Sequence, residues 1–203
     1  FGVCTLIDPS TAEWHAVHLP FLVLHAEIAP GTGPAGEAAP GPALWGHCAA
    51  ANPIGRLLQA RGHLDHVLCV FQGPHGYISP SWYVDQPSVP TWNYVAAHVT
   101  GTLVLDADMT IVRQRLVQTV AKHEAPRRPL PWTLDALPEA EVERDLQGVA
   151  GFTVVPTRVE GVAKLSQNRS RADALGAIQG LRAAGTPADA ELAEWMQRAL
   201  PPA

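Results

Sequence analysis

The stretch from Val67 to Gly101 constrains the fold of this chain more than any other. It opens with the uninterrupted apolar run VLCVF, whose β-branched and aromatic residues are typical of a buried strand. Glycine and proline at positions 73, 74 and 76 break that run, and extended structure resumes at Tyr77. After a loop with two prolines, strand character returns from Trp92 to Val99. The stretch therefore predicts a strand–loop–strand unit.

The rest of the chain is mostly extended at first and helical later. Hydrophobic periodicity and turn residues predict further strands at 1–7, 14–28, 43–49, 102–105 and 151–160. Capping residues and apolar stripes predict helices at 53–61, 106–124, 138–147, 170–184 and 186–199. Strands that do not alternate regularly with helices argue against a Rossmann sheet. We predict a mainly β fold, a β-barrel with helices packed outside.

The same reading predicts the domain organisation. We expect a barrel domain over residues 1–160, with a helical insertion at about 106–147. Residues 161–203 form a C-terminal helical extension packed on the barrel. The low-complexity segment 30–42, rich in Gly, Pro and Ala, is interpreted as a surface loop.

Composition limits the possible partners and compartment. The net charge is −5, and no Lys/Arg cluster exceeds the pair Arg127-Arg128, so the chain lacks the basic footprint of nucleic-acid binders. No run approaches 18 apolar residues, which predicts no membrane span. Cys4, Cys48 and Cys69 lie in apolar runs without CxxC spacing. They favour a reducing compartment, and we predict a cytoplasmic protein without a disulfide framework or structural zinc.

The common signatures of catalysis are missing from the sequence. It contains no GxGxxG, P-loop, HExxH or GxSxG motif, and no nucleophile–His–acid arrangement is readable, so we assign no catalytic residue. His15 and His18 are three apart on a predicted strand and so face opposite sides. His63 and His66 have no nearby acidic or cysteine partner beyond Asp65, so we assign no metal site.

Three clusters of polar and aromatic residues are candidates for ligand binding. The segment GHCAAANP (46–53) joins a strand end to a helix N-terminus, a natural place for a phosphate, although a plain helix cap has the same pattern. The loop flanks 75–83 and 91–94 set short polar groups among aromatic planes, which suits a flat, hydrogen-bonding ligand but also a core or a dimer interface. The segment KLSQNR (164–169) places two cations around Ser, Gln and Asn, which suits an anion or a polar approach to a helix.

Taken together, these motifs resemble a known family. HLPF (18–21), GHCAAANP, FQGPHGYISPSWY, VPTWNYVAAHVTG and KLSQNR resemble, in content and order, the PaiB family of FMN-binding negative transcriptional regulators. The resemblance implies an FMN-binding split β-barrel that forms a homodimer with ligand sites at the subunit interface. It also implies FMN as cofactor and a role in transcription, with DNA as a partner by resemblance alone.

The resemblance also implies which residues bind FMN. Three fall where the family holds the flavin phosphate: His47, Ala49 and Asn52. Five would line the ring: Tyr77, Ser79, Trp82, Thr91 and Asn93. Four would close the site from the partner subunit: Lys164, Ser166, Gln167 and Asn168.

Two positions depart from the family pattern. Ala50 stands where the family has an Arg, and Val162 stands where it tends to have a Lys. Both changes remove a positive charge, which predicts weak or absent FMN binding because charge-assisted phosphate contacts are the stronger ones. We expect a binding protein without turnover. The alternatives are a flavin- or haem-dependent oxidoreductase on the same barrel, or a dimeric module whose flavin site has degenerated.

Overall fold

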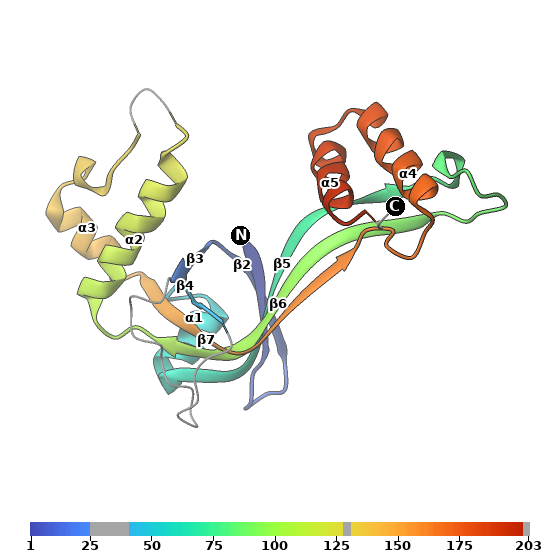
Figure 1. Cartoon of the computed structure of the whole chain (residues 1–203). Helices are drawn as coiled ribbons and strands as arrows, with labels where there is room; N and C mark the ends of the chain where they lie inside the picture. Colours follow the sequence, from blue (N-terminus) through green and yellow to red (C-terminus); the bar gives the residue numbers. More distant parts are fainter. Residues whose placement is uncertain (25–40, 128–130, 201–203) are drawn as a thin grey trace. The chain divides into compact units, whose positions relative to one another are not determined.

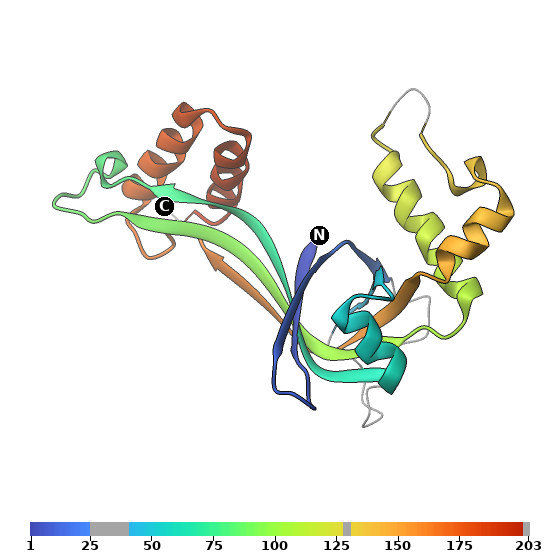
Figure 2. The same cartoon turned by 180° about the vertical axis from the view of Figure 1, so that it is seen from behind.

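A computed structural model describes residues 1–24, 41–127 and 131–200. Its strands form a seven-stranded sheet in the order β2-β1-β5-β6-β7-β4-β3, with five α-helices along the chain (Figures 1 and 2). The mainly β fold with flanking helices is therefore confirmed. Most of the loop predicted at 30–42 lies outside the described residues.

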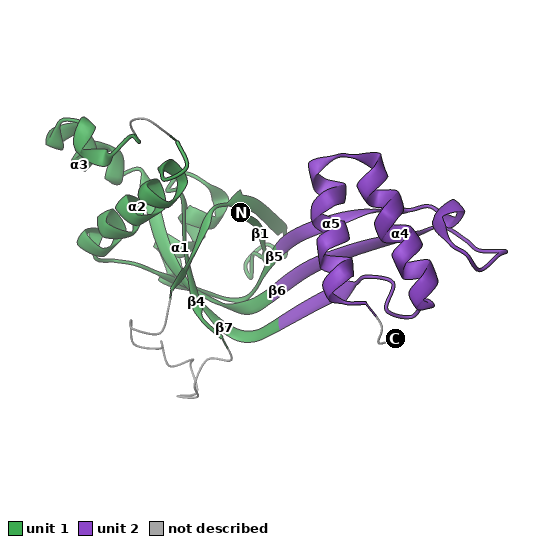
Figure 3. Ribbon diagram, turned by 45° about the horizontal axis from the view of Figure 1, so that its top comes forward, with its two compact units in different colours: residues 1–70, 99–159 green, residues 71–98, 160–203 purple. Residues whose placement is uncertain are grey.

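The chain divides into two compact units (Figure 3). Unit 1 comprises Phe1–Val70 and Val99–Val159, and unit 2 comprises Phe71–His98 and Glu160–Ala203. The hairpin at 71–98 thus groups with the C-terminal helices. The three long strands, β5, β6 and β7, each contribute a segment to both units.

The N-terminal strands of unit 1 form two antiparallel pairs. β1 (Gly2–Ile7) pairs with β2 (Trp14–Leu19) as an antiparallel hairpin. β3 (Phe21–Leu24) pairs instead with β4 (Ala43–Ala49). The single strand predicted over 14–28 is wrong, because the chain breaks at Pro20, which has no N–H to donate to a ladder. Its last residues, 25–28, lie outside the described part.

The long strands run further than the sequence predicts. β5 spans His63–Ile78 and continues through the glycines and proline that were expected to break it. β6 spans Thr91–Leu105, uniting two predicted segments, and β7 spans Val149–Lys164. Between β5 and β6 lies the short 3-10 helix η1 (Pro80–Trp82).

The helices of unit 1 follow the predicted capping signals. α1 (Pro53–Arg61) begins after Asn52, and α2 (Met109–Glu124) begins after Asp108, whose carboxylate accepts from the N–H of Thr110. α3 (Glu139–Leu146) is joined to α2 by an ion pair between Arg113 and Glu139. A second 3-10 helix, η2 (Leu134–Ala136), lies between α2 and α3.

The core under α2 centres on Trp45. Leu22, Trp45 and Val112 form one buried cluster, with Leu116 and Val149 packed against it. Because strand side chains alternate, β4 points Trp45 to the face that α2 covers. Trp45 is 1 % exposed, and its indole N–H donates to Asp106 Oδ2 at 2.7 Å.

Unit 2 is a two-layer structure in which α4 (Arg171–Ala184) and α5 (Pro187–Arg198) pack on one face of the strands. Both helices begin at predicted caps, Ser170 and Thr186. Their apolar faces share a buried cluster with strand residues; its members include Ile78, Leu165, Ile178, Leu181, Leu192 and Met196. No helix in the described ranges is long and apolar enough to cross a membrane.

The three cysteines are free thiols with buried side chains. Cys4 of β1 lies directly opposite Cys69 of β5. Within the described part of the chain, His, Cys, Asp and Glu side chains do not gather in groups of three or more that could hold a metal ion.

Candidate functional site

The predicted binding residues fall into two groups, one in each unit. His47, Ala49 and Asn52 lie in unit 1, at the end of β4 and the start of α1. The other nine, from Tyr77 to Asn168, lie in unit 2.

The turn before α1 is a tight, well-capped structure. Asn52 is extended (φ −64°, ψ 146°), and its Oδ1 accepts from the N–H of Ile54 at 3.0 Å. Its own N–H donates to the carbonyl of Ala49 at 2.9 Å. A Cβ on Gly55 would lie 2.5 Å from that carbonyl oxygen, so only glycine lets the helix approach the turn so closely.

Arg56 brings a positive charge to this turn, and the sequence reading missed it. Its Nε donates to the carbonyl of Ala51 at 2.9 Å, so the guanidinium folds back over the start of α1. A cation near a helix N-terminus opposes the helix dipole, so this placement favours an anion nearby. Sequence spacing could have indicated this, because Arg56 lies four residues after the Asn52 cap and residues four apart are neighbours on a helix surface.

His47 faces α2. Its ring stacks on Trp45, two residues earlier on the same face of β4, with centroids 5.3 Å apart and an interplanar angle of 29°. Its Nδ1 is buried without a hydrogen-bond partner. Burial lowers the pKa of His47 below its usual value, so the imidazole is neutral at pH 7.

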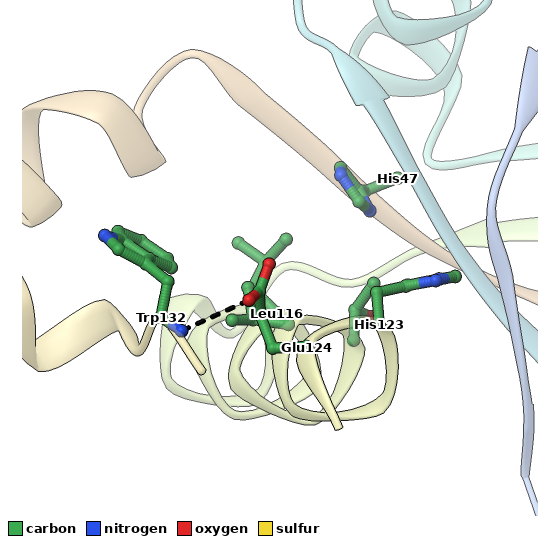
Figure 4. Close-up of a pocket in the computed structure, with 7 residues that line it drawn as sticks. His47, Leu116, His123, Glu124 and Trp132 are labelled. Atoms are coloured by element: carbon green, nitrogen blue, oxygen red, sulfur yellow. Dashed lines mark hydrogen bonds between the residues drawn. The ribbon is translucent and has the colours of Figure 1, made fainter. Parts of the chain in front are cut away.

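A pocket of about 260 Å³ opens between β4 and α2 in unit 1 (Figure 4). Its lining comprises His47, Leu116, Thr119, Val120, His123, Glu124 and Trp132. Leu116 and Val120 are only partly buried, whereas Val112, on the same helix, is fully buried. Across the pocket, the backbone N–H of Trp132 donates to Glu124 Oε2 at 3.2 Å.

In unit 2, the structure brings Asn93 and Ser166 together in the interior. Asn93 is fully buried, and its Nδ2 donates to Ser166 Oγ at 2.9 Å and contacts Met196 Sδ at 3.3 Å. Ser166 holds a positive φ of 64°, which is uncommon for a residue with a Cβ. The Asn93 Oδ1 atom is buried without a hydrogen-bond partner. These two residues therefore link β6, the turn after β7 and α5.

Lys164 and Thr91 form a second contact between β7 and β6. The Lys164 ammonium donates to Thr91 Oγ1 at 2.7 Å. By strand alternation, Thr91 shares a face with Asn93, the face that α4 and α5 cover. Lys164 itself is exposed, so its ammonium remains accessible to an anion.

The opposite face of this hairpin carries exposed aromatic side chains. The Trp92 ring stacks on His75 with centroids 6.0 Å apart and meets Tyr77 edge-on at 6.4 Å. Trp92 and Tyr77 are each 49 % exposed, and Tyr94 is 36 % exposed. Tyr77 is therefore on the open aromatic face, defined here as His75, Tyr77, Trp92 and Tyr94, while Asn93 points away from it.

Ser79 and Trp82 have local packing partners. Ser79 caps η1, its Oγ accepting from the N–H of Ser81 at 3.2 Å. Trp82 fits a groove on α4 made by Gly176 and Gly180, where added Cβ atoms would lie 2.0 Å from its carbonyl oxygen and 2.2 Å from its ring. Both residues thus have structural roles in unit 2.

The turn after β7 holds the last predicted residues. Gln167 closes it, with Oε1 accepting from the N–H of Leu165 at 2.7 Å and Nε2 donating to the carbonyl of Ala163 at 2.8 Å. Asn168 is exposed. Arg169, which the sequence grouped with Lys164, lies over the ring of Tyr83, 4.5 Å from its centroid.

Comparisons with known proteins agree with the motifs. The family model described as "Putative FMN-binding domain" matches residues 1–158. The protease synthase and sporulation protein PAI 2 of Bacillus subtilis is 37% identical over 156 residues, covering 76% of this chain and 72% of that protein. An uncharacterized protein of Aspergillus fumigatus is 30% identical, covering 88% and 80%. The solved FAD- and haem-binding protein of Mycobacterium smegmatis has a TM-score of 0.48 and 14% identity, covering 80% and 64%.

Proposed function

Because the chain belongs to the FMN-binding domain family that includes the Bacillus PAI 2 protein, we propose that it binds FMN, forms a homodimer and acts in transcriptional regulation. The family match over residues 1–158 carries the proposal. It agrees with the split-barrel fold class implied by the sequence motifs.

The turn before α1 suits the phosphate end of a flavin. A helix N-terminus attracts anions through its free N–H groups and its dipole. Arg56 adds a guanidinium at Ala51, next to the position where the family's arginine is replaced by Ala50. We propose that Arg56 compensates for that loss. His47, Ala49 and Asn52 remain predicted contacts of the same group.

In unit 2, the accessible members of the predicted set suit direct contact with a flavin. Lys164, Thr91 and Asn168 offer a cation, a hydroxyl and an exposed amide, while Tyr77 offers an aromatic plane on the opposite face of the hairpin. The buried or packed members are proposed to hold these groups in place; they are Asn93, Ser166, Ser79, Trp82 and Gln167, whose amide closes the turn after β7. FMN, when bound, supplies a visible chromophore and a redox-active ring.

Titration with FMN tests the proposal. We expect the purified protein to bind FMN with a shift of the flavin absorbance bands and quenching of flavin fluorescence. Arg56→Ala and Lys164→Ala should each raise the Kd for FMN about tenfold, the loss of one charge-assisted contact. Lys122→Ala, an exposed lysine in the last turn of α2, is the matched control and should leave the Kd unchanged. A protein that stays colourless and ignores FMN would contradict the proposal.

The role in transcription is tested separately. A gel-shift assay with fragments from the protein's own promoter region, with and without FMN, should show a shifted band. The affinity should fall as salt rises from 50 to 200 mM, because phosphate contacts release counterions. Absence of a shift at any salt would remove direct DNA binding from the proposed function.

A further inference from the structure

The pocket between β4 and α2 shares only His47 with the proposed flavin contacts, and its chemistry is distinct from theirs. Every lining residue belongs to unit 1. Its volume of about 260 Å³ lies just below the roughly 300–1,000 Å³ of pockets for drug-sized ligands. The pocket therefore suits a small molecule.

The walls favour an apolar body. Leu116 and Val120 lie one helical turn apart on α2, and both line the pocket. Trp132 lies across from Leu116 in Figure 4. An indole beside branched aliphatic side chains packs well against a ring or a short aliphatic chain. This wall selects for apolar surface on the ligand.

Two polar groups of the pocket, the Glu124 carboxylate and His47 Nδ1, determine which polar groups the ligand must carry. The Glu124 carboxylate rises from α2 between Trp132 and His47 in Figure 4, and one of its oxygens accepts the Trp132 N–H. Arg127, whose Nε is 4.0 Å from the other oxygen, is mostly exposed, and an exposed pair of this kind is weak. The buried Nδ1 of His47 has no hydrogen-bond partner, and a buried polar atom of this kind is normally satisfied.

The charge balance decides between ligand classes. The pocket lining contains one carboxylate and no Lys or Arg. His47 is neutral because burial disfavours its charged form. Because the exposed Arg127 pairs only weakly with Glu124, the Glu124 carboxylate would repel a ligand carboxylate or phosphate, whereas an ammonium group would pair with it.

We propose that this pocket binds a small amine, with its ammonium group against Glu124, its apolar body against Leu116, Val120 and Trp132, and a hydroxyl or N–H donating to His47 Nδ1. Phenolic amines have these three features. The proposal does not depend on FMN binding, because Glu124, Val120 and Trp132 are outside the proposed flavin contacts.

Calorimetric titration of the full chain with a matched series tests the ligand class. Tyramine should bind, 4-hydroxyphenylacetate should bind at least tenfold more weakly, and phenethylamine, which lacks the hydroxyl, should fall between them. Equal binding of tyramine and 4-hydroxyphenylacetate, or no tyramine binding at millimolar concentration, would overturn the proposal.

Variants test the residues. Glu124→Gln should weaken tyramine binding at least tenfold while leaving the response to FMN as in the wild type. Glu194→Gln is the matched control, because Glu194 also pairs with an arginine along its helix but lies in unit 2. Val120→Trp, which fills the pocket, should abolish tyramine binding. A circular dichroism spectrum checks that Glu124→Gln and Val120→Trp fold. Wild-type tyramine affinity in Glu124→Gln or in Val120→Trp would refute the assignment; loss of FMN binding alone would refute only the proposed function.

Discussion

Asp106 shows how one residue joins several parts of unit 1. Its Oδ2 accepts from the indole N–H of Trp45 at 2.7 Å, and its Oδ1 accepts from the Thr153 hydroxyl at 3.2 Å. Its own N–H donates to the carbonyl of Gly151 at 3.0 Å. Burial raises the pKa of Asp106 above its usual value, although the two side-chain hydrogen bonds and the charge of Arg115 act in the opposite direction. Desolvation therefore outweighs these contacts.

The raised pKa of Asp106 predicts a pH dependence of stability. Above the unfolded-state pKa of about 4, the folded chain holds this proton more tightly than the unfolded chain, so this group's contribution to stability falls as pH rises through the folded pKa. In Asp106→Asn, whose amide oxygen still accepts from Trp45, that decline should be absent. We expect the free energy of unfolding of the wild type to fall relative to the variant between pH 4 and pH 7, measured by urea denaturation.

The exposed Asp145, paired with Arg144 at 3.2 Å, supplies the control for this experiment. Asp145→Asn should follow the wild-type profile over the same pH range. Parallel profiles for the wild type and Asp106→Asn would show that Asp106 titrates normally in the folded state.

Among the elements, α4 depends on two glycines that a helix would ordinarily disfavour. Gly176 and Gly180 lie one turn apart and receive Trp82, whose ring would lie 2.2 Å from a Cβ on Gly180. Alanine in place of a helical glycine stabilises an isolated helix by about 1 kcal/mol. Here overpacking, typically about 1–3 kcal/mol, opposes that gain and should exceed it.

Gly180→Ala should therefore lower the free energy of unfolding by about 1 kcal/mol. Gly161→Ala in β7 is the control, because a Cβ there meets no atom within 4 Å. Denaturant unfolding of both variants measures the difference. A stabilised Gly180→Ala would mean that helix propensity outweighs the contact with Trp82.

Local signals predicted the helices better than the strands. The caps Asn52, Asp108, Ser170 and Thr186 were readable because each acts on N–H groups two or three residues away. The continuity of β5 through Pro74, in contrast, depends on where the pairing with β1 ends, which local sequence does not show. β1 pairs with β5 only over Leu68–Val70, so beyond Val70 that side of β5 has no β1 hydrogen bonds for a proline to break.

For the molecule as a whole, the motifs identified the family, while the three-dimensional role of each residue needed the structure. Alternation along β6 separates Asn93, fully buried, from Trp92, which is half-exposed, although both belong to one motif. The left-handed backbone of Ser166 has no readable sequence signature, and the spacing of Arg56 from the Asn52 cap does not show that its guanidinium folds back onto Ala51. The proposed flavin contacts and the amine pocket thus rest on geometry that residue order alone does not supply.

The open aromatic face of unit 2 gives the proposed homodimer a testable interface. A cluster of four exposed ring side chains on one sheet face is unusual for a surface in contact with water alone, and aromatic residues are enriched where proteins associate. We propose a second copy of this chain as the partner. A charge placed at Trp92 would then be buried without a partner, at a cost of several kcal/mol.

Trp92→Arg should raise the dimer dissociation constant at least a hundredfold, measured by sedimentation across a concentration series. Trp195→Arg introduces the same charge at a tryptophan that is 37 % exposed on α5, away from the open face, and should leave dimerisation unchanged. A wild-type chain that sediments as a monomer would refute the homodimer. A dimer that survives Trp92→Arg would place the interface elsewhere. Only the face carrying Trp92 is proposed to be covered, so an equal loss of dimerisation in both variants would point to a general effect of added charge.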